Sequence, residues 1–106
     1  MKGRISMLEL KKHVDQLTKS ELVLDVRAPG EYREGHIPGS RNIPHDSVAQ
    51  YAPELMKYET VYVHCRSGGR VQMAVQELER LGVKNLVCVV GSGMPDWEAA
   101  GYPVEK

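Results

Sequence analysis

At 106 residues, 42% of them apolar, the chain is long enough for one domain, spanning residues 1–106, with one hydrophobic core. Its 14 lysines and arginines balance 14 aspartates and glutamates, and a net charge of zero argues against nucleic acid or an anionic membrane surface as a partner. Its longest apolar run, residues 86–90, is far shorter than the roughly 20 residues that a membrane-spanning helix needs.

The expected secondary structure alternates short strands with helices, which is the pattern of an α/β domain with a mainly parallel sheet. Strands are predicted where apolar runs are short and β-branched, and helices where apolar residues recur every three or four positions. In chain order these are a helix at residues 6–17, a strand at 21–26, a helical turn at 31–33, a strand at 42–44, a helix begun by Asp46 that restarts at Pro53 and runs to residue 57, a strand at 60–64, a helix at 70–81, a strand at 86–90 and a helix at 95–100.

Two of these helices have well-marked ends. The first opens on a capping box, in which Ser6 caps the helix and Glu9 reaches back to it. The helix at 70–81 is followed by Gly82, a typical residue just after a helix end. Its apolar residues share one face: Val71, Ala74, Val75, Leu78 and Leu81.

The segment Cys65-Arg66-Ser67-Gly68-Gly69-Arg70 joins the strand at 60–64 to this helix and carries the candidate site. In open α/β sheets, ligands bind beyond the carboxyl ends of the strands. The two glycines permit a loop that turns several N–H groups toward one point, and the helix start adds a partial positive charge. With an arginine on each side, this loop favours the thiolate of Cys65, a nucleophile that needs no adjacent base. The alternative is a cysteine that ends a strand beside an ordinary tight turn.

Four stretches of the chain, in unbroken order from about residue 6 to residue 104, together resemble the rhodanese family. The loop from Cys65 to Arg70 is similar to the six-residue active-site loop of single-domain rhodaneses. The other similar stretches are Leu24-Asp25-Val26-Arg27 with Glu31-Tyr32, Gly35-His36-Ile37-Pro38-Gly39-Ser40 with Asn42-Ile43-Pro44, and Gly93-Met94 with Trp97 and Gly101-Tyr102-Pro103-Val104. Two positions depart from the family pattern: Val71 replaces a small or hydroxyl residue, and Ser92-Gly93 replaces paired glycines.

The resemblance implies a rhodanese fold, with a small, mostly parallel five-stranded sheet and helices on both faces. It implies that Cys65 takes a sulfane sulfur from a donor such as thiosulfate, carries it as a persulfide, and gives it to cyanide or a thiol. The donor is expected to bind the rest of the loop, where the arginines would attract an anion. These substrate-binding residues are Arg66, Ser67, Gly68, Gly69 and Arg70. No metal and no organic cofactor is implied.

Two other functions use a similar loop. Cysteine-dependent phosphatases and arsenate reductases place an arginine six positions after the cysteine, whereas Arg70 lies five positions after Cys65 and Val71 occupies the sixth. A loop that is one residue shorter suits a single sulfur better than a phosphate. The second alternative is a persulfide carrier or interaction module that delivers sulfur to a protein partner, for which the same loop is needed.

The remaining polar and aromatic candidates are expected to be structural. Asp25 and Arg27 predict an internal ion pair or turn cap, and His36 a turn residue. Solvated or hydrogen-bonded histidines without metal-ligand spacing are expected at His13, His45 and His64. An inert buried thiol is expected at Cys88, and a seal over the core at Trp97 and Tyr102. Two cysteines in a chain whose start does not resemble a secretory signal predict a reducing compartment, the cytoplasm.

Overall fold

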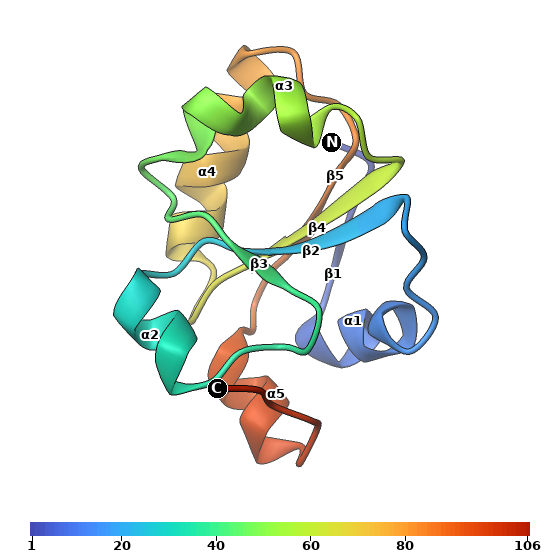
Figure 1. Cartoon of the computed structure of the whole chain (residues 1–106), viewed down its shortest axis with the longest axis vertical. Coiled ribbons are helices and arrows are strands. Elements are labelled where there is room, and N and C mark those ends of the chain that lie inside the picture. Colours follow the sequence, from blue (N-terminus) through green and yellow to red (C-terminus); the bar gives the residue numbers. More distant parts are fainter.

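Five strands form a single parallel sheet in the computed structural model, which describes residues 1–106 (Figure 1). The strand order is β1-β5-β4-β2-β3, and every neighbouring pair is parallel. The bounds are β1 Gly3–Ile5, β2 Glu21–Asp25, β3 Arg41–Asn42, β4 Thr60–His64 and β5 Leu86–Val89. All five residues of the central strand β4 are buried, because helices cover both faces of the sheet.

The helices divide between the two faces of the sheet, with α3 and α4 on one side and α1 and α5 on the other (Figure 1). Their bounds are α1 Met7–Val14, α2 Pro29–Glu34, the 3₁₀ helix η1 Val48–Tyr51, α3 Ala52–Leu55, α4 Gly69–Arg80 and α5 Met94–Ala99. Side chains alternate along β4, so Val61 and Val63 pack under α4 whereas Tyr62 packs on the side of Trp97. Cys65 continues the row of Val61 and Val63 on the α4 side.

The α/β prediction is confirmed, and the sheet is parallel throughout rather than in most of its pairs. The helix at 70–81 is confirmed within one residue at each end as α4. The first helix is shorter than expected: α1 ends at Val14 rather than near residue 17. Asp46 does not begin a helix: a turn precedes η1, and α3 follows it directly. The sequence patterns also missed β1, a three-residue strand on the edge beside β5.

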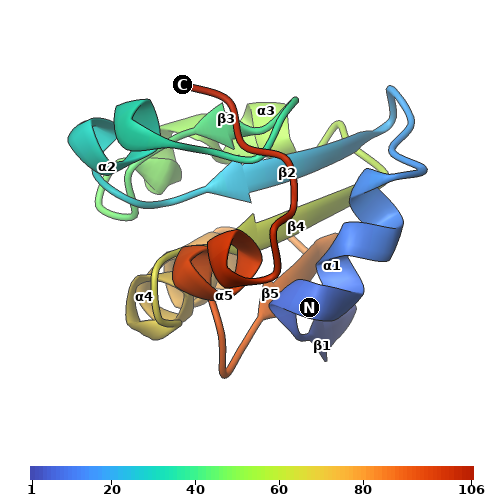
Figure 2. The same ribbon diagram turned by 90° about the horizontal axis from the view of Figure 1, so that it is seen from below.

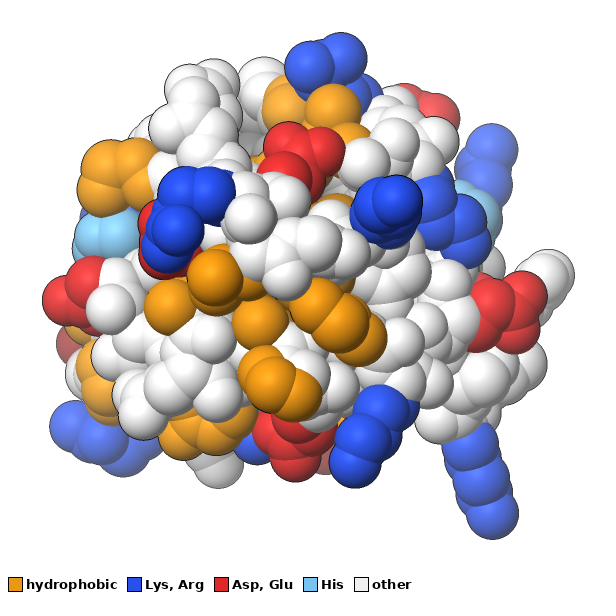
Figure 3. Space-filling model, turned by 90° about the horizontal axis from the view of Figure 1, so that it is seen from above, with side chains coloured by type: hydrophobic (Ala, Val, Ile, Leu, Met, Phe, Trp, Pro, Cys, Tyr) orange, Lys and Arg blue, Asp and Glu red, His pale blue; other side chains and the backbone are white.

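The carboxyl ends of β2 and β4 point to the side of the molecule where α2 and the start of α4 lie (Figure 2). The loop from Cys65 to Arg70 is therefore at the edge of the sheet where ligands bind in such folds. On the face seen from the opposite direction, cationic and acidic side chains are scattered among polar and apolar ones (Figure 3). None of the helices has the length and apolar character that crossing a membrane requires.

Candidate active site

Cys65 follows β4 directly, and its sulfur is held by the loop that comes after it. The backbone N–H of Gly68 donates a hydrogen bond to Cys65 Sγ over 3.0 Å. Gly68 has a φ of 105°, a left-handed conformation that glycine adopts without steric cost. This conformation turns the chain back, so that its N–H faces the sulfur and α4 begins at the next residue. Cys65 is 1% exposed, so a reacting molecule must approach through the loop edge.

Four more N–H groups of this loop donate to no protein acceptor: those of Arg66, Ser67, Gly69 and Arg70. The last two belong to the first turn of α4, where backbone N–H groups lack partners within the helix. The helix end also carries a partial positive charge. The loop therefore offers several free donors, close to Cys65 along the chain, to a negatively charged sulfur.

The N-terminus of α5 fixes the other side of the loop. The N–H of Met94 donates to the carbonyl oxygen of Cys65 over 3.0 Å. At Gly93 the two segments approach so closely that a Cβ atom would lie 1.9 Å from the Arg66 carbonyl oxygen and 2.5 Å from that of Cys65. Gly93 and Met94 belong to a stretch that resembles the family, but the sequence pattern predicts no role for them. In the structure they anchor the backbone at Cys65 and Arg66.

Arg70 is paired with Glu31 of α2. Its Nη1 donates to Glu31 Oε1 and its Nη2 to Oε2, the latter over 3.0 Å. This pairing with the guanidinium lowers the pKa of Glu31 to about 2 and raises the pKa of Arg70. The charge of Arg70, which the sequence analysis assigned to an anionic donor, is therefore already balanced by a carboxylate. From the sequence, Glu31 is only one residue of a stretch that resembles the family. Its partner Arg70 lies 39 residues further along the chain.

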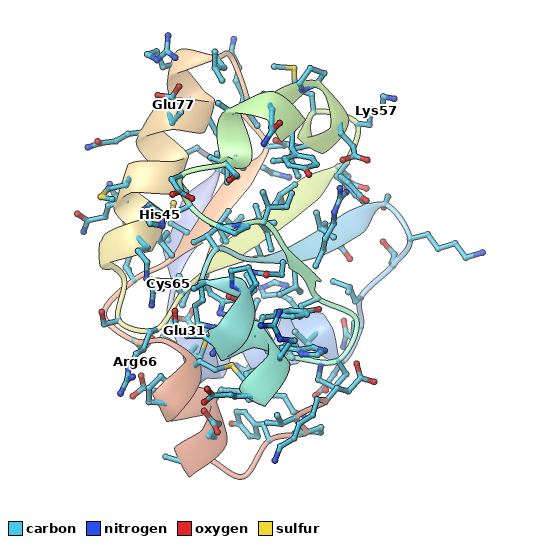
Figure 4. All side chains as sticks on the ribbon, turned by 60° about the vertical axis from the view of Figure 1, so that its left-hand side comes forward. Glu31, His45, Lys57, Cys65, Arg66 and Glu77 are labelled. Carbon is cyan, nitrogen blue, oxygen red and sulfur yellow. The ribbon has the colours of Figure 1, made fainter.

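Arg66 differs from Arg70 because its side chain is exposed and has no ion-pair partner. It points outward beside Cys65, close to Glu31, in Figure 4. Arg66 borders a hollow of about 290 Å³ whose other walls come from Arg27, from α2 with the adjoining Gly35, and from α5. The two loop arginines thus have different surroundings: one is held against α2, and the other faces solvent.

Asp25 and Arg27 form the internal ion pair that was expected. Arg27 Nε donates to both carboxylate oxygens of Asp25 over 3.0 Å, and its Nη2 donates to Asp25 Oδ2 over 2.7 Å and to the Gly35 carbonyl over 2.8 Å. Both residues are buried, with Asp25 fully so. The pair therefore joins the end of β2 to the segment that follows α2.

The expectation for His64 is wrong, because its side chain is neither solvated nor hydrogen-bonded. It is fully buried at the last position of β4, and neither ring nitrogen has a hydrogen-bond partner. Its Nε2 lies 3.8 Å from Asp25 Oδ2, and burial lowers its pKa. Covered faces were expected, but which polar groups the fold brings to the end of β4 cannot be read from the residues next to His64.

His36 has a structural position, but it pairs with Glu105 in an antiparallel bridge, and the turn lies at residues 38–39. Its Nδ1 lies 2.8 Å from the carbonyl oxygen of Tyr32, and the two rings stack. The expectations for Cys88 and Trp97 as buried residues are confirmed. Cys88 is buried in β5, and burial raises the pKa of its thiol. Trp97 is fully buried and donates its Nε1–H to the Pro103 carbonyl over 2.8 Å.

Comparisons with known proteins place the chain in one family. Residues 6–100 match the family model described as Rhodanese-like domain. The putative sulfur carrier protein YrkF of Bacillus subtilis is 40% identical over 93 residues, which are 88% of this chain and 49% of that protein. The chain therefore spans about half the length of that relative. Thiosulfate sulfurtransferase GlpE of Pseudoalteromonas translucida is 29% identical over 94 residues, covering 88% of this chain and 89% of that one.

A solved structure shows the same fold. The rhodanese-related protein of Thermoplasma volcanium superimposes with a TM-score of 0.79 at 35% identity, over 96% of each chain.

Proposed function

The chain belongs to the rhodanese-like family, and from this premise we propose that residues 1–106 form a single rhodanese domain that transfers sulfane sulfur through a persulfide on Cys65. In coarse terms the chain is a rhodanese-like sulfurtransferase or sulfur carrier. The proposal adds the nucleophile, the loop residues that support it and the order of the two steps.

In the first step the Cys65 thiolate attacks the outer sulfur of a donor such as thiosulfate. A sulfur–sulfur bond forms to Cys65 while the sulfur–sulfur bond of thiosulfate breaks, and sulfite leaves with the electron pair. In the second step cyanide or a thiolate attacks the terminal sulfur of the persulfide. Thiocyanate or a new persulfide leaves, and Cys65 returns as a thiolate. Because electrons move only between sulfur and its nucleophiles, neither step needs a metal or an organic cofactor.

The observation that carries this proposal is the hydrogen bond from the Gly68 N–H to Cys65 Sγ. A donor aimed at sulfur stabilises the thiolate before the reaction and the anionic sulfur after it. We assign the unpaired N–H groups of Arg66, Ser67, Gly69 and Arg70 to the terminal sulfur of the persulfide or to the donor. The exposed guanidinium of Arg66 is assigned to the approach of reactants, whereas Arg70 holds the loop against Glu31.

Mass spectrometry of the purified protein tests the proposal. Incubation with thiosulfate should add one sulfur atom to the chain, on Cys65, and cyanide should remove it. Cys65→Ser should abolish loading, because a serine hydroxyl stays protonated and is a weak nucleophile. Cys88→Ser is the matched control: this thiol is buried and its pKa is raised, so loading should persist without it. Cyanide-removable sulfur on the Cys65→Ser variant, or on Cys88, would contradict the assignment.

A persulfide carrier that delivers sulfur to a protein is the second candidate function. The name of YrkF, a putative sulfur carrier, favours it, and carrier and enzyme share the same loop chemistry. A sulfur-label transfer from the loaded chain to candidate acceptor proteins, compared with transfer to cyanide, distinguishes the two. Both free thiols lead us to propose the cytoplasm as the compartment, since its reducing conditions preserve them.

The phosphatase alternative is tested with an aryl phosphate. Val71 occupies the sixth position after Cys65, where phosphatases have an arginine, and it is buried on the face of α4 that packs against the sheet. Val71 is itself a residue of α4, and its uncharged side chain faces the core rather than the loop. We therefore expect no phosphate release under conditions where the chain loads sulfur.

A further inference from the structure

The hollow beside the Cys65 loop is bordered by more acidic than basic side chains. Three carboxylates line it, Glu31 and Glu34 from α2 and Glu98 from α5. Two guanidinium groups line it as well, Arg27 and Arg66.

Several of these charges are already compensated within the protein. Arg27 is bonded to the buried carboxylate of Asp25, and Glu31 is bonded to Arg70. Glu34, Glu98 and Arg66 form no ion pair, and all three side chains are exposed. The uncompensated charges at the hollow are therefore two carboxylates and one guanidinium, so a cation is favoured there over an anion.

The hollow adjoins the reacting sulfur through two residues. Arg66 follows Cys65 in the chain, and Met94, which also lines the hollow, donates its N–H to the Cys65 carbonyl. Figure 4 shows Arg66 and Glu31 on the same side of the molecule as Cys65. Cys65 itself is 1% exposed, and a reactant that occupies the hollow lies next to Arg66, the residue that follows Cys65. A charged group on such a reactant is near Glu34 and Glu98, which line the same hollow.

We propose that Glu34 and Glu98 are specificity-determining residues that select sulfur acceptors with a positive charge next to the thiol. The inference rests on the proposed function and names the acceptor class for the same site. The acceptor thiol loses its proton to solvent, and its thiolate attacks the terminal sulfur of the Cys65 persulfide. The bond between that sulfur and Cys65 Sγ breaks, Cys65 leaves as a thiolate, and the acceptor becomes the persulfide. During this step the carboxylates attract the cationic group and disfavour an anionic one.

The test uses three small thiols of similar size as acceptors from the preloaded protein. Cysteamine carries an ammonium, 2-mercaptoethanol is neutral, and mercaptoacetate carries a carboxylate. Loss of the extra sulfur is followed by mass spectrometry, and each rate is divided by the rate at which the same thiol attacks a small neutral disulfide in solution, so that differences in acceptor acidity and nucleophilicity cancel. We expect cysteamine to be the fastest and mercaptoacetate the slowest, with the ratio shrinking in high salt.

Charge-removing variants then locate the effect. Each of Glu34→Gln and Glu98→Gln should lower the cysteamine-to-mercaptoacetate ratio by about 1.5- to 5-fold, as expected for exposed charges. Glu77→Gln removes a carboxylate from α4, far from Cys65 in Figure 4, and should leave the ratio unchanged. Equal rates for the three thiols, or a ratio that survives in the Glu34→Gln/Glu98→Gln double variant, would overturn the inference. Failure of the wild-type chain to load sulfur at all would instead overturn the proposed function beneath it.

Discussion

Replacing Gly93 with alanine should displace the backbone of Cys65 and Arg66 without changing either side chain. The added Cβ would lie 1.9 Å from the Arg66 carbonyl oxygen and 2.3 Å from its carbonyl carbon, so the loop and α5 must separate by at least about 1.1 Å to reach a 3.0 Å contact. The backbone at Gly93 is extended, with a φ of −170°, so the cost comes from this collision and not from backbone conformation. The separation also stretches the hydrogen bond from Met94 to Cys65.

The magnitude follows from these two losses. Overpacking a tight contact costs about 1–3 kcal/mol, and a lost hydrogen bond adds about 0.5–1.5 kcal/mol. We therefore expect the free energy of unfolding to fall by about 2–4 kcal/mol, which lowers Tm by about 10–30 °C in a domain of this size. A displacement of this order at a reacting group also predicts sulfur loading slower by about 10- to 100-fold.

Thermal unfolding and the rate of loading by thiosulfate, measured well below the Tm of the variant, check both parts. Gly30→Ala is the matched control, because a Cβ there meets nothing within 4 Å. A Gly93→Ala protein that unfolds and loads sulfur like the wild type would refute the claim that α5 anchors the loop.

Two further variants test the pair between Arg70 and Glu31. Arg70→Ala should raise the KM for thiosulfate more than it raises the KM for a neutral sulfur donor, because it leaves Glu31 as an uncompensated negative charge at the site. Steady-state kinetics with both donors measures this difference. An equal rise in KM for the two donors would show that Arg70 acts by shaping the loop. Because the pKa of Glu31 is lowered to about 2 from 4.5, the pair stabilises the fold above pH 4.5 and loses this effect as the pH falls toward 2. The free energy of unfolding of the wild type should therefore exceed that of Glu31→Gln by a constant amount at neutral pH. Denaturant titrations should show this difference shrinking below pH 4.5. A difference that stays constant down to pH 3 would contradict the pairing.

The parts of the site that depend on residues close together in the sequence could be predicted. The buried run of β4, the glycines after Cys65 and the apolar face of α4 are local patterns, and together they fixed the position of the loop. The helix end at residue 80 was predictable for the same reason, since Gly82 follows it with a φ of 90°.

The missing parts depend on contacts between distant segments. Glu31 and Arg70 lie 39 residues apart, so no spacing rule connects them. β1 consists of Gly3, Arg4 and Ile5, and what makes it a strand is the hydrogen-bonded edge of β5 rather than its own composition. The lack of hydrogen-bond partners at His64 likewise depends on which groups the fold brings to the end of β4.

Cys65 is translated before Met94, the residue that anchors its carbonyl group. The cysteine emerges first, and α5 is added 29 residues later, an interval of a few seconds at ordinary rates of translation. During that interval the strand and loop exist without the N–H that fixes the Cys65 carbonyl and without the close contact at Gly93. The backbone of Cys65 therefore receives its last anchor from α5, long after the strand and loop that carry it have been synthesised.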